Sequence, residues 1–169
     1  MEKLRRELHR ELTCVNRAYL WLFSLGALIL GILFAIGGVN RFVYGCLLLP
    51  RGALPPFLLI LLWGLMLFVF GASVSLAYSS PLCLKTQTRQ SVLLLFLASL
   101  VLCYVWIPMV YKAASFFLAL LVLAVLFLSL AVMLLSICKT HRTAAIGIGI
   151  FALWIAYIFY YTFALFLLN

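Results

Sequence analysis

Long stretches without a charged residue dominate this chain. Five of them occur, at 18–40, 52–84, 90–111, 113–138 and 143–169. Each is long enough for about 20 apolar residues, the length of helix that crosses the hydrocarbon core of a bilayer. Because 69% of the residues are hydrophobic and only 9% are charged, a water-soluble domain would lack a polar surface. We therefore predict an all-α membrane protein, a bundle of five transmembrane helices.

Prolines, serines and basic residues mark the ends of these predicted helices. We expect helices at about 18–39, 55–78, 91–110, 114–138 and 144–168, within one transmembrane domain over 18–169. In the basic arm before them, 1–17, Leu4, Leu8 and Leu12 recur at four-residue spacing. This spacing predicts an amphipathic helix at the headgroup level, with partner binding as the alternative. We expect the 40–54 loop, which carries apolar residues, to fold against the bundle.

Basic residues are unequally divided between the two ends of the predicted bundle. Nine of the twelve lysines and arginines lie in the arm and in the second and fourth loops, whereas Arg41, Arg51 and Lys112 lie on the opposite side. By the positive-inside rule, we predict a cytoplasmic N-terminus and an external C-terminus. We interpret the net charge of +9 as orientation and contact with anionic membrane lipids, and we expect no binding of nucleic acid.

Acidic residues are confined to Glu2, Glu7 and Glu11, before the first predicted helix. The predicted helices therefore lack the intramembrane carboxylates of proton-coupled transporters, the acidic rings of cation channels and the paired carboxylates of hydrolases. Five cysteines without C-x-x-C pairing and two distant histidines predict neither a disulfide framework nor a metal site. We assign no catalytic residue.

Small residues recur at four-residue spacing within three of the predicted helices. The three motifs are Ala27-x3-Gly31-x3-Ala35, Gly71-x3-Ser75 and Ala145-x3-Gly149. Such faces let helix backbones approach closely in lipid. They serve either packing within the bundle or a homodimer face, and the pattern alone favours packing within the bundle.

Aromatic residues supply the remaining chemistry inside the predicted bundle. Trp63 and Trp106 lie in the second and third helices, and Trp154 is the eleventh residue of the last, near mid-membrane. One face of the last helix carries, at helical spacing, Phe151, Trp154, Tyr157 and Tyr161. Two interpretations stay open for these rings: core packing, or a pocket for a flat apolar ligand that the hydroxyls would orient.

Several motifs resemble those of the translocator protein family (TspO/MBR), also called tryptophan-rich sensory proteins or peripheral benzodiazepine receptors. The second predicted helix opens with Pro55-Pro56 and carries Trp63 and Gly71, like the P-P…W…G segment of the family. The third ends with Trp106-Ile107-Pro108-Met109-Val110-Tyr111, which is similar to N-x-x-W-x-P-x-F-F. In the last, Trp154 and Tyr157 stand where the family has W-x-x-F. The resemblance covers residues 18–168.

The sequence departs from the family pattern at several positions. Cys103 and Thr162 stand where the family has asparagines, and Ile150 stands where it has a proline. The acidic residue of the fourth helix and the tryptophan-rich segment before Pro55 are missing. The resemblance therefore supports the fold more firmly than it supports any particular ligand.

The resemblance implies a receptor or transporter-like protein that binds a planar hydrophobic ligand, either a tetrapyrrole (protoporphyrin or haem) or a sterol-like lipid. It also implies a homodimer, and we expect this one in a bacterial cytoplasmic membrane, with no required cofactor. The candidate ligand-binding residues are Trp63, Trp106, Trp154, Tyr157, Tyr161, Phe151, Cys103 and Thr162. We expect a pocket among the first, second and fifth helices, beneath the 40–54 loop, with Arg41 and Arg51 paired to ligand carboxylates.

Two other functions compete with ligand binding. A structural or accessory membrane protein would assemble with a partner through its small-residue faces and would bind no small molecule. Some bacterial members of the resembled family are linked to light-dependent degradation of porphyrins, so an enzyme of that kind is the third hypothesis. Stoichiometric ligand binding separates the first hypothesis from the second. Product formation under light, lost in Trp154→Phe, would support the third.

Overall fold

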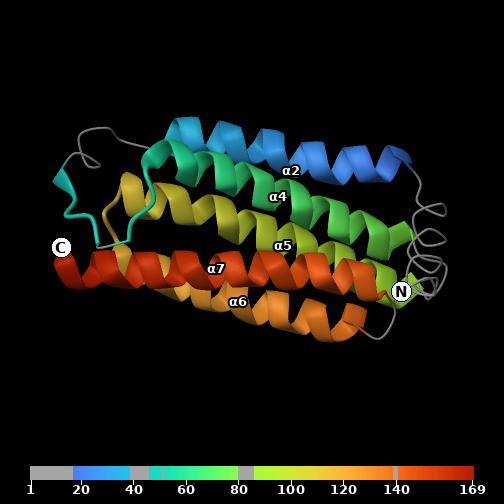
Figure 1. Cartoon of the computed structure of the whole chain (residues 1–169). Helices are drawn as coiled ribbons and strands as arrows, with labels where there is room; N and C mark the ends of the chain where they lie inside the picture. Colours follow the sequence, from blue (N-terminus) through green and yellow to red (C-terminus); the bar gives the residue numbers. More distant parts are fainter. Residues whose placement is uncertain (1–16, 39–45, 51, 80–85, 139–140) are drawn as a thin grey trace.

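The computed structural model describes residues 17–38, 46–50, 52–79, 86–138 and 141–169. Five helices dominate these residues: α2 (Arg17–Gly38), α4 (Pro56–Ser79), α5 (Thr86–Tyr111), α6 (Phe116–Cys138) and α7 (Arg142–Leu168), as Figure 1 shows. No β-strand occurs in the described part of the chain. The prediction of an all-α bundle of five helices is confirmed.

The helix ends lie within two residues of the predicted ends, with one exception. The exception is α5, which begins at Thr86 instead of Ser91. Its first turns are polar, and a hydropathy pattern reports only the part of a helix that lies in hydrocarbon. A helix that contains residues of good helical propensity, such as Gln and Arg, can continue beyond that boundary.

Four helices, α4 to α7, are long and apolar enough to cross a membrane, and α2 adds a shorter apolar segment, Ala18–Phe34. Large apolar side chains cover the outside of the bundle; Leu135 is 71% exposed and Leu153 is 74% exposed. Such a surface would aggregate in water, whereas it matches the acyl chains of a bilayer. Helix length and outer surface together indicate an integral multi-pass membrane protein.

The helices pack as a closed ring. In ring order, α2 packs against α4, α4 against α7, α7 against α6, α6 against α5, and α5 against α2. The helix α4 also contacts α5 across the interior. The start of α2 and the end of α7 lie at opposite ends of the bundle (Figure 1). Large side chains that point inward therefore meet in the middle of the ring, between helices that are not themselves neighbours.

Glycines allow α4 to approach its neighbours closely. A Cβ atom on Gly71 would lie 2.6 Å from the carbonyl oxygen of Phe23 on α2, and one on Gly147 of α7 would overlap the hydroxyl of Ser73. Gly71 of the Gly71-x3-Ser75 motif thus serves packing within the bundle, as its spacing favours, whereas Gly147 lies outside the predicted motifs. Gly149 differs, because a Cβ atom there would meet nothing within 4 Å.

Some expectations concern residues outside the described part of the chain. The arm over 1–17 is described only at Arg17, where α2 begins, and Arg41 and Arg51 lie outside the described residues. The orientation in the membrane remains a prediction.

Candidate functional site

A row of four aromatic side chains fills the interior between α4, α5 and α7. The rings of Trp63 and Trp106 are stacked, with centroids 5.1 Å apart and planes 21° apart. Trp154 meets Trp63 edge-on at 6.4 Å and stacks on Tyr157 at 5.4 Å. We call Trp106, Trp63, Trp154 and Tyr157 the aromatic row. The row therefore lies between the second, third and fifth helices of the bundle, whereas we expected the pocket among the first, second and fifth helices.

Helical spacing explains why these rings point inward. On α4, Trp63 begins a series of buried residues at three- and four-residue intervals that continues through Leu67, Phe70 and Val74. On α7, the predicted face is confirmed, because Phe151, Trp154 and Tyr161 are buried and Tyr157 is half-buried. Each helix therefore presents an aromatic stripe to the interior.

Trp106 is the innermost ring of the row, with only 1% of its surface exposed. Its Nε1 donates a hydrogen bond to Oγ1 of Thr162 at 3.1 Å, and that hydroxyl donates to the carbonyl oxygen of Ile158 at 2.8 Å. A buried indole whose N–H is satisfied holds one orientation, because rotation would leave the donor unpaired. Trp106 therefore forms a fixed wall of the site.

Trp63 and Trp154 differ from Trp106 in their hydrogen bonding. The Nε1 atom of each is buried and has no acceptor among the described residues, although their side chains are 7% and 8% exposed. An unpaired buried donor costs about 1–3 kcal/mol, and lipid offers it no acceptor. These two donors lie on rings that contact each other, so an acceptor oxygen that reached either of them would gain a hydrogen bond.

The loop between α2 and α4 meets the row at Tyr157. The hydroxyl of Tyr157 donates to the carbonyl oxygen of Gly52 at 3.4 Å. Gly52 has a φ of +92°, which glycine adopts without strain. Further along α7, the side-chain amide of Asn169 accepts from the N–H of Leu48 at 2.9 Å and donates to its carbonyl oxygen at 3.2 Å. The described part of the loop is therefore held by α7 at two points.

The other predicted site residues lie at different depths. Tyr161 accepts a hydrogen bond from the Tyr111 hydroxyl at 3.4 Å, and Tyr111 meets Trp106 edge-on at 5.9 Å, so Tyr161 adjoins the row. Phe151 belongs to another layer, where it stacks on Phe70 at 4.4 Å. Cys103 is fully buried on α5, one turn before Trp106.

Three groups that contact the predicted site residues were not among the predicted ones. Phe70 follows Trp63 by two helical turns, and this spacing could have found it. Tyr111 is the last residue of the Trp106–Tyr111 motif, so the motif could have identified it as a site residue. The carbonyl oxygen of Gly52 could not be found, because no side-chain pattern reports a backbone contact between a loop and a helix.

The side chains of the row determine which contacts it can make. Among the described residues, no group of three His, Cys, Asp or Glu side chains could hold a metal ion. The row instead offers aromatic faces and edges, two unpaired N–H donors and the Tyr157 hydroxyl.

Comparison with known proteins adds one finding. The model of the TspO/MBR family matches residues 20–168, which is nearly the whole chain. No curated protein matches the sequence.

Proposed function

This chain belongs to the TspO/MBR family, and we propose that it binds a planar hydrophobic ligand at the aromatic row. The ligand class we propose is a tetrapyrrole, protoporphyrin or haem, with a sterol-like lipid as the second class. The observation that carries the proposal is the pair of buried indole N–H groups, on Trp63 and Trp154, that have no acceptor within the described part of the chain. Family membership and the multi-pass bundle support a ligand-binding or transporter-like role in general.

The arrangement of the rings favours a flat ligand at one side of the row. Trp63 and Trp106 each cover one face of the other, so a ligand meets the uncovered parts of Trp63 and Trp154 and the half-buried Tyr157. Edge and face contacts between aromatic groups stabilise a complex by about 0.5–1.5 kcal/mol, in addition to the hydrophobic contribution of the buried surface area. A tetrapyrrole adds carboxylate oxygens at its periphery, which can accept hydrogen bonds from the indole donors.

Charge distribution favours an anionic ligand. No aspartate or glutamate follows Glu11, so the five helices carry no carboxylate side chain that would repel one. Within the proposal, Arg41 and Arg51 pair with ligand carboxylates at the membrane surface, where bidentate arginine–carboxylate bonds are strong. The proposal also includes a homodimer in a bacterial cytoplasmic membrane.

A fluorescence titration tests the proposal. The full chain in detergent is titrated with protoporphyrin IX, and the quenching of tryptophan emission is compared with that of a Trp154→Phe, Tyr157→Phe variant. A Trp21→Phe variant is the control, because Trp21 is 53% exposed on α2, outside the row. We expect saturable quenching at micromolar ligand, retained in the control and weakened in the row variant.

Two outcomes would contradict the proposal. Quenching that rises linearly and equally in all three proteins would mean partitioning of the porphyrin into the micelle. Saturable quenching that the row variant leaves unchanged would place the porphyrin elsewhere.

A further inference from the structure

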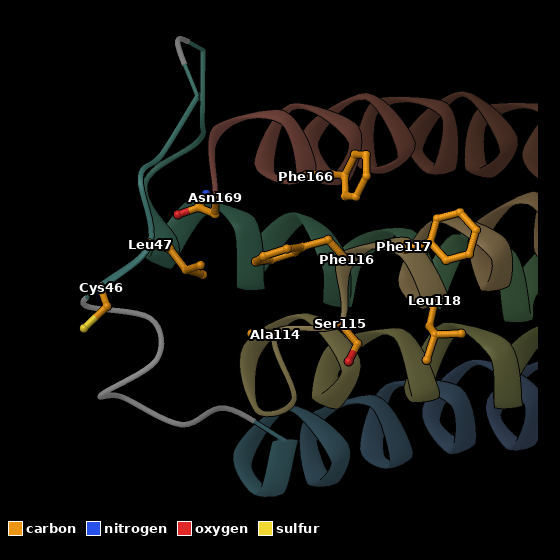
Figure 2. Close-up of a pocket in the computed structure, with 9 residues that line it drawn as sticks. All are labelled: Cys46, Leu47, Ala114, Ser115, Phe116, Phe117, Leu118, Phe166 and Asn169. Atoms are coloured by element: carbon orange, nitrogen blue, oxygen red, sulfur yellow. The ribbon is translucent and has the colours of Figure 1, made fainter.

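A cavity of about 730 Å³ opens where the loop meets the start of α6 and the end of α7 (Figure 2). Its volume lies within the range of about 300–1,000 Å³ that is typical of ligand pockets. Its wall includes Leu47 from the loop, Phe116, Phe117 and Leu118 from α6, Phe166 from α7, and Asn169, which caps α7. None of its lining residues belongs to the aromatic row, so this cavity is a separate site.

The loop side of the cavity is fixed in place. Asn169 binds both backbone groups of Leu48, which holds the neighbouring Leu47 in the wall. Figure 2 shows Phe116 pointing toward Leu47, with Asn169 beside the loop at the end of α7. The cavity is therefore shaped before any ligand enters.

The cavity opens toward the bilayer at the depth of the headgroups. Phe117 is 60% exposed and Phe166 is 44% exposed, so the apolar wall reaches the outer surface of the bundle. The 27 residues of α7 make a helix about 40 Å long, close to the thickness of a bilayer with its headgroups. Centred on a hydrocarbon core of about 30 Å, such a helix extends about 5 Å into the headgroups at each end. The last turn of α7, which carries Phe166, therefore lies near the boundary between acyl chains and headgroups, and an acyl chain can enter the cavity from the side.

One basic residue lies close to the cavity along the chain. Lys112 is exposed and precedes Ala114, a lining residue, by two positions, which span at most about 7 Å of chain. The start of α6 adds the backbone N–H groups that precede the first helical hydrogen bond, which Ala119 donates to the carbonyl oxygen of Ser115, and the positive end of the helix dipole. No carboxylate side chain after Glu11 competes for these groups.

We propose that this cavity binds one anionic phospholipid of the surrounding bilayer. One acyl chain packs against Leu47, Phe116 and Phe166, and the phosphate lies between Lys112 and the start of α6. A zwitterionic phospholipid offers the same acyl chains without the net negative charge. Selection between the two headgroups is therefore the signature of the site.

Native mass spectrometry of the full chain in non-ionic detergent tests this site. Dioleoyl phosphatidylglycerol and dioleoyl phosphatidylcholine are titrated in separate arms. We expect one phosphatidylglycerol to bind each chain about fivefold more tightly than phosphatidylcholine, the contribution of about one basic residue at an anionic headgroup. Lys112→Gln should remove this preference, and Leu118→Trp should weaken both lipids by filling the cavity.

Each variant has a matched control at a position outside the cavity. Arg142→Gln removes the same charge at the start of α7, the opposite end of that helix from the cavity. Leu128→Trp makes the same exchange on α6 at a position that is 66% exposed and does not line the cavity. Both controls should bind phosphatidylglycerol like the unchanged protein. If Leu118→Trp fails to fold, as shown by aggregation in size-exclusion chromatography, Leu118→Phe replaces it.

Three results would overturn the proposal. The first is equal affinity for the two lipids in the unchanged protein. The second is equal weakening by Arg142→Gln and Lys112→Gln, which would indicate attraction to overall charge. The third is unchanged binding in the folded variant at Leu118, which would indicate lipid bound elsewhere on the surface.

Discussion

The indole Nε1 of Trp106 donates a hydrogen bond to Oγ1 of Thr162 at 3.1 Å, and this bond joins α5 to α7 through the interior of the ring. These two helices are not packed side by side, so long side chains bridge them. Thr162 in turn donates to the carbonyl oxygen of Ile158 on its own helix. The threonine thus satisfies the tryptophan and fixes its ring as the inner wall of the aromatic row.

Removal of the Thr162 hydroxyl should destabilise the bundle. In Thr162→Val the indole N–H of Trp106 loses its acceptor inside an apolar interior, at a cost of about 1–3 kcal/mol. Thermal unfolding in detergent, followed by circular dichroism, measures the loss. Thr162→Ser keeps the hydroxyl and should remain close to the unchanged protein. A Thr162→Val variant as stable as Thr162→Ser would show that the bond contributes nothing.

The close approach of α2 and α4 should not tolerate a methyl group at Gly71. The added Cβ atom would lie 2.6 Å from the backbone carbonyl oxygen of Phe23, and a backbone atom cannot move aside as a side chain can. We expect Gly71→Ala to cost about 1–3 kcal/mol in thermal unfolding, as overpacked cores do. Gly149→Ala is the control, because nothing lies within 4 Å of its Cβ position. Equal stability of the two variants would contradict the packing of α2 on α4.

The Asn169 side chain should protect the loop from solvent exchange. Asn169→Ala removes the acceptor of the Leu48 N–H and the donor to its carbonyl oxygen. A hydrogen bond contributes about 0.5–1.5 kcal/mol net, so the amide of Leu48 should exchange roughly two- to tenfold faster. Hydrogen–deuterium exchange with mass spectrometry, on peptides that contain Leu48, reports the rate. Unchanged exchange in Asn169→Ala would show that the loop is held by other contacts.

The two loop arginines should matter only for ligands with free carboxylates. Replacing Arg41 and Arg51 with glutamine removes the proposed bidentate partners and should weaken protoporphyrin IX more than its dimethyl ester. Each ligand is titrated against both proteins by fluorescence quenching. Equal weakening of the acid and the ester would contradict the pairing and leave the arginines a general role in the loop.

Much of the fold could be predicted because hydrocarbon imposes a simple rule on sequence. Charge-free stretches of sufficient length must form helices there, which is why the helix ends were predicted within two residues except at Thr86. The inward face of α7 also followed from spacing, since Phe151, Trp154 and Tyr161 recur with the helical period.

The hydrogen bonding of the site could not be predicted in the same way. Periodicity places Trp63, Trp106 and Trp154 inside, but it does not say which indole meets an acceptor. That depends on Thr162 lying opposite Trp106, 56 positions away, while none of the described residues offers an acceptor to the other two indoles. The order of the helices around the ring determines which residues lie opposite each indole, and a hydropathy pattern carries no information about that order.

The most direct test is a ¹H–¹⁵N NMR spectrum of protein labelled with ¹⁵N at the tryptophan indoles. The chain has four tryptophans, so each indole N–H gives one assignable signal. On titration with protoporphyrin IX, we predict saturable shifts that are largest for Trp63 and Trp154, smaller for Trp106 and absent for the outward Trp21. Saturable binding with the signals of Trp63 and Trp154 unmoved would contradict their role as the donors that receive the ligand.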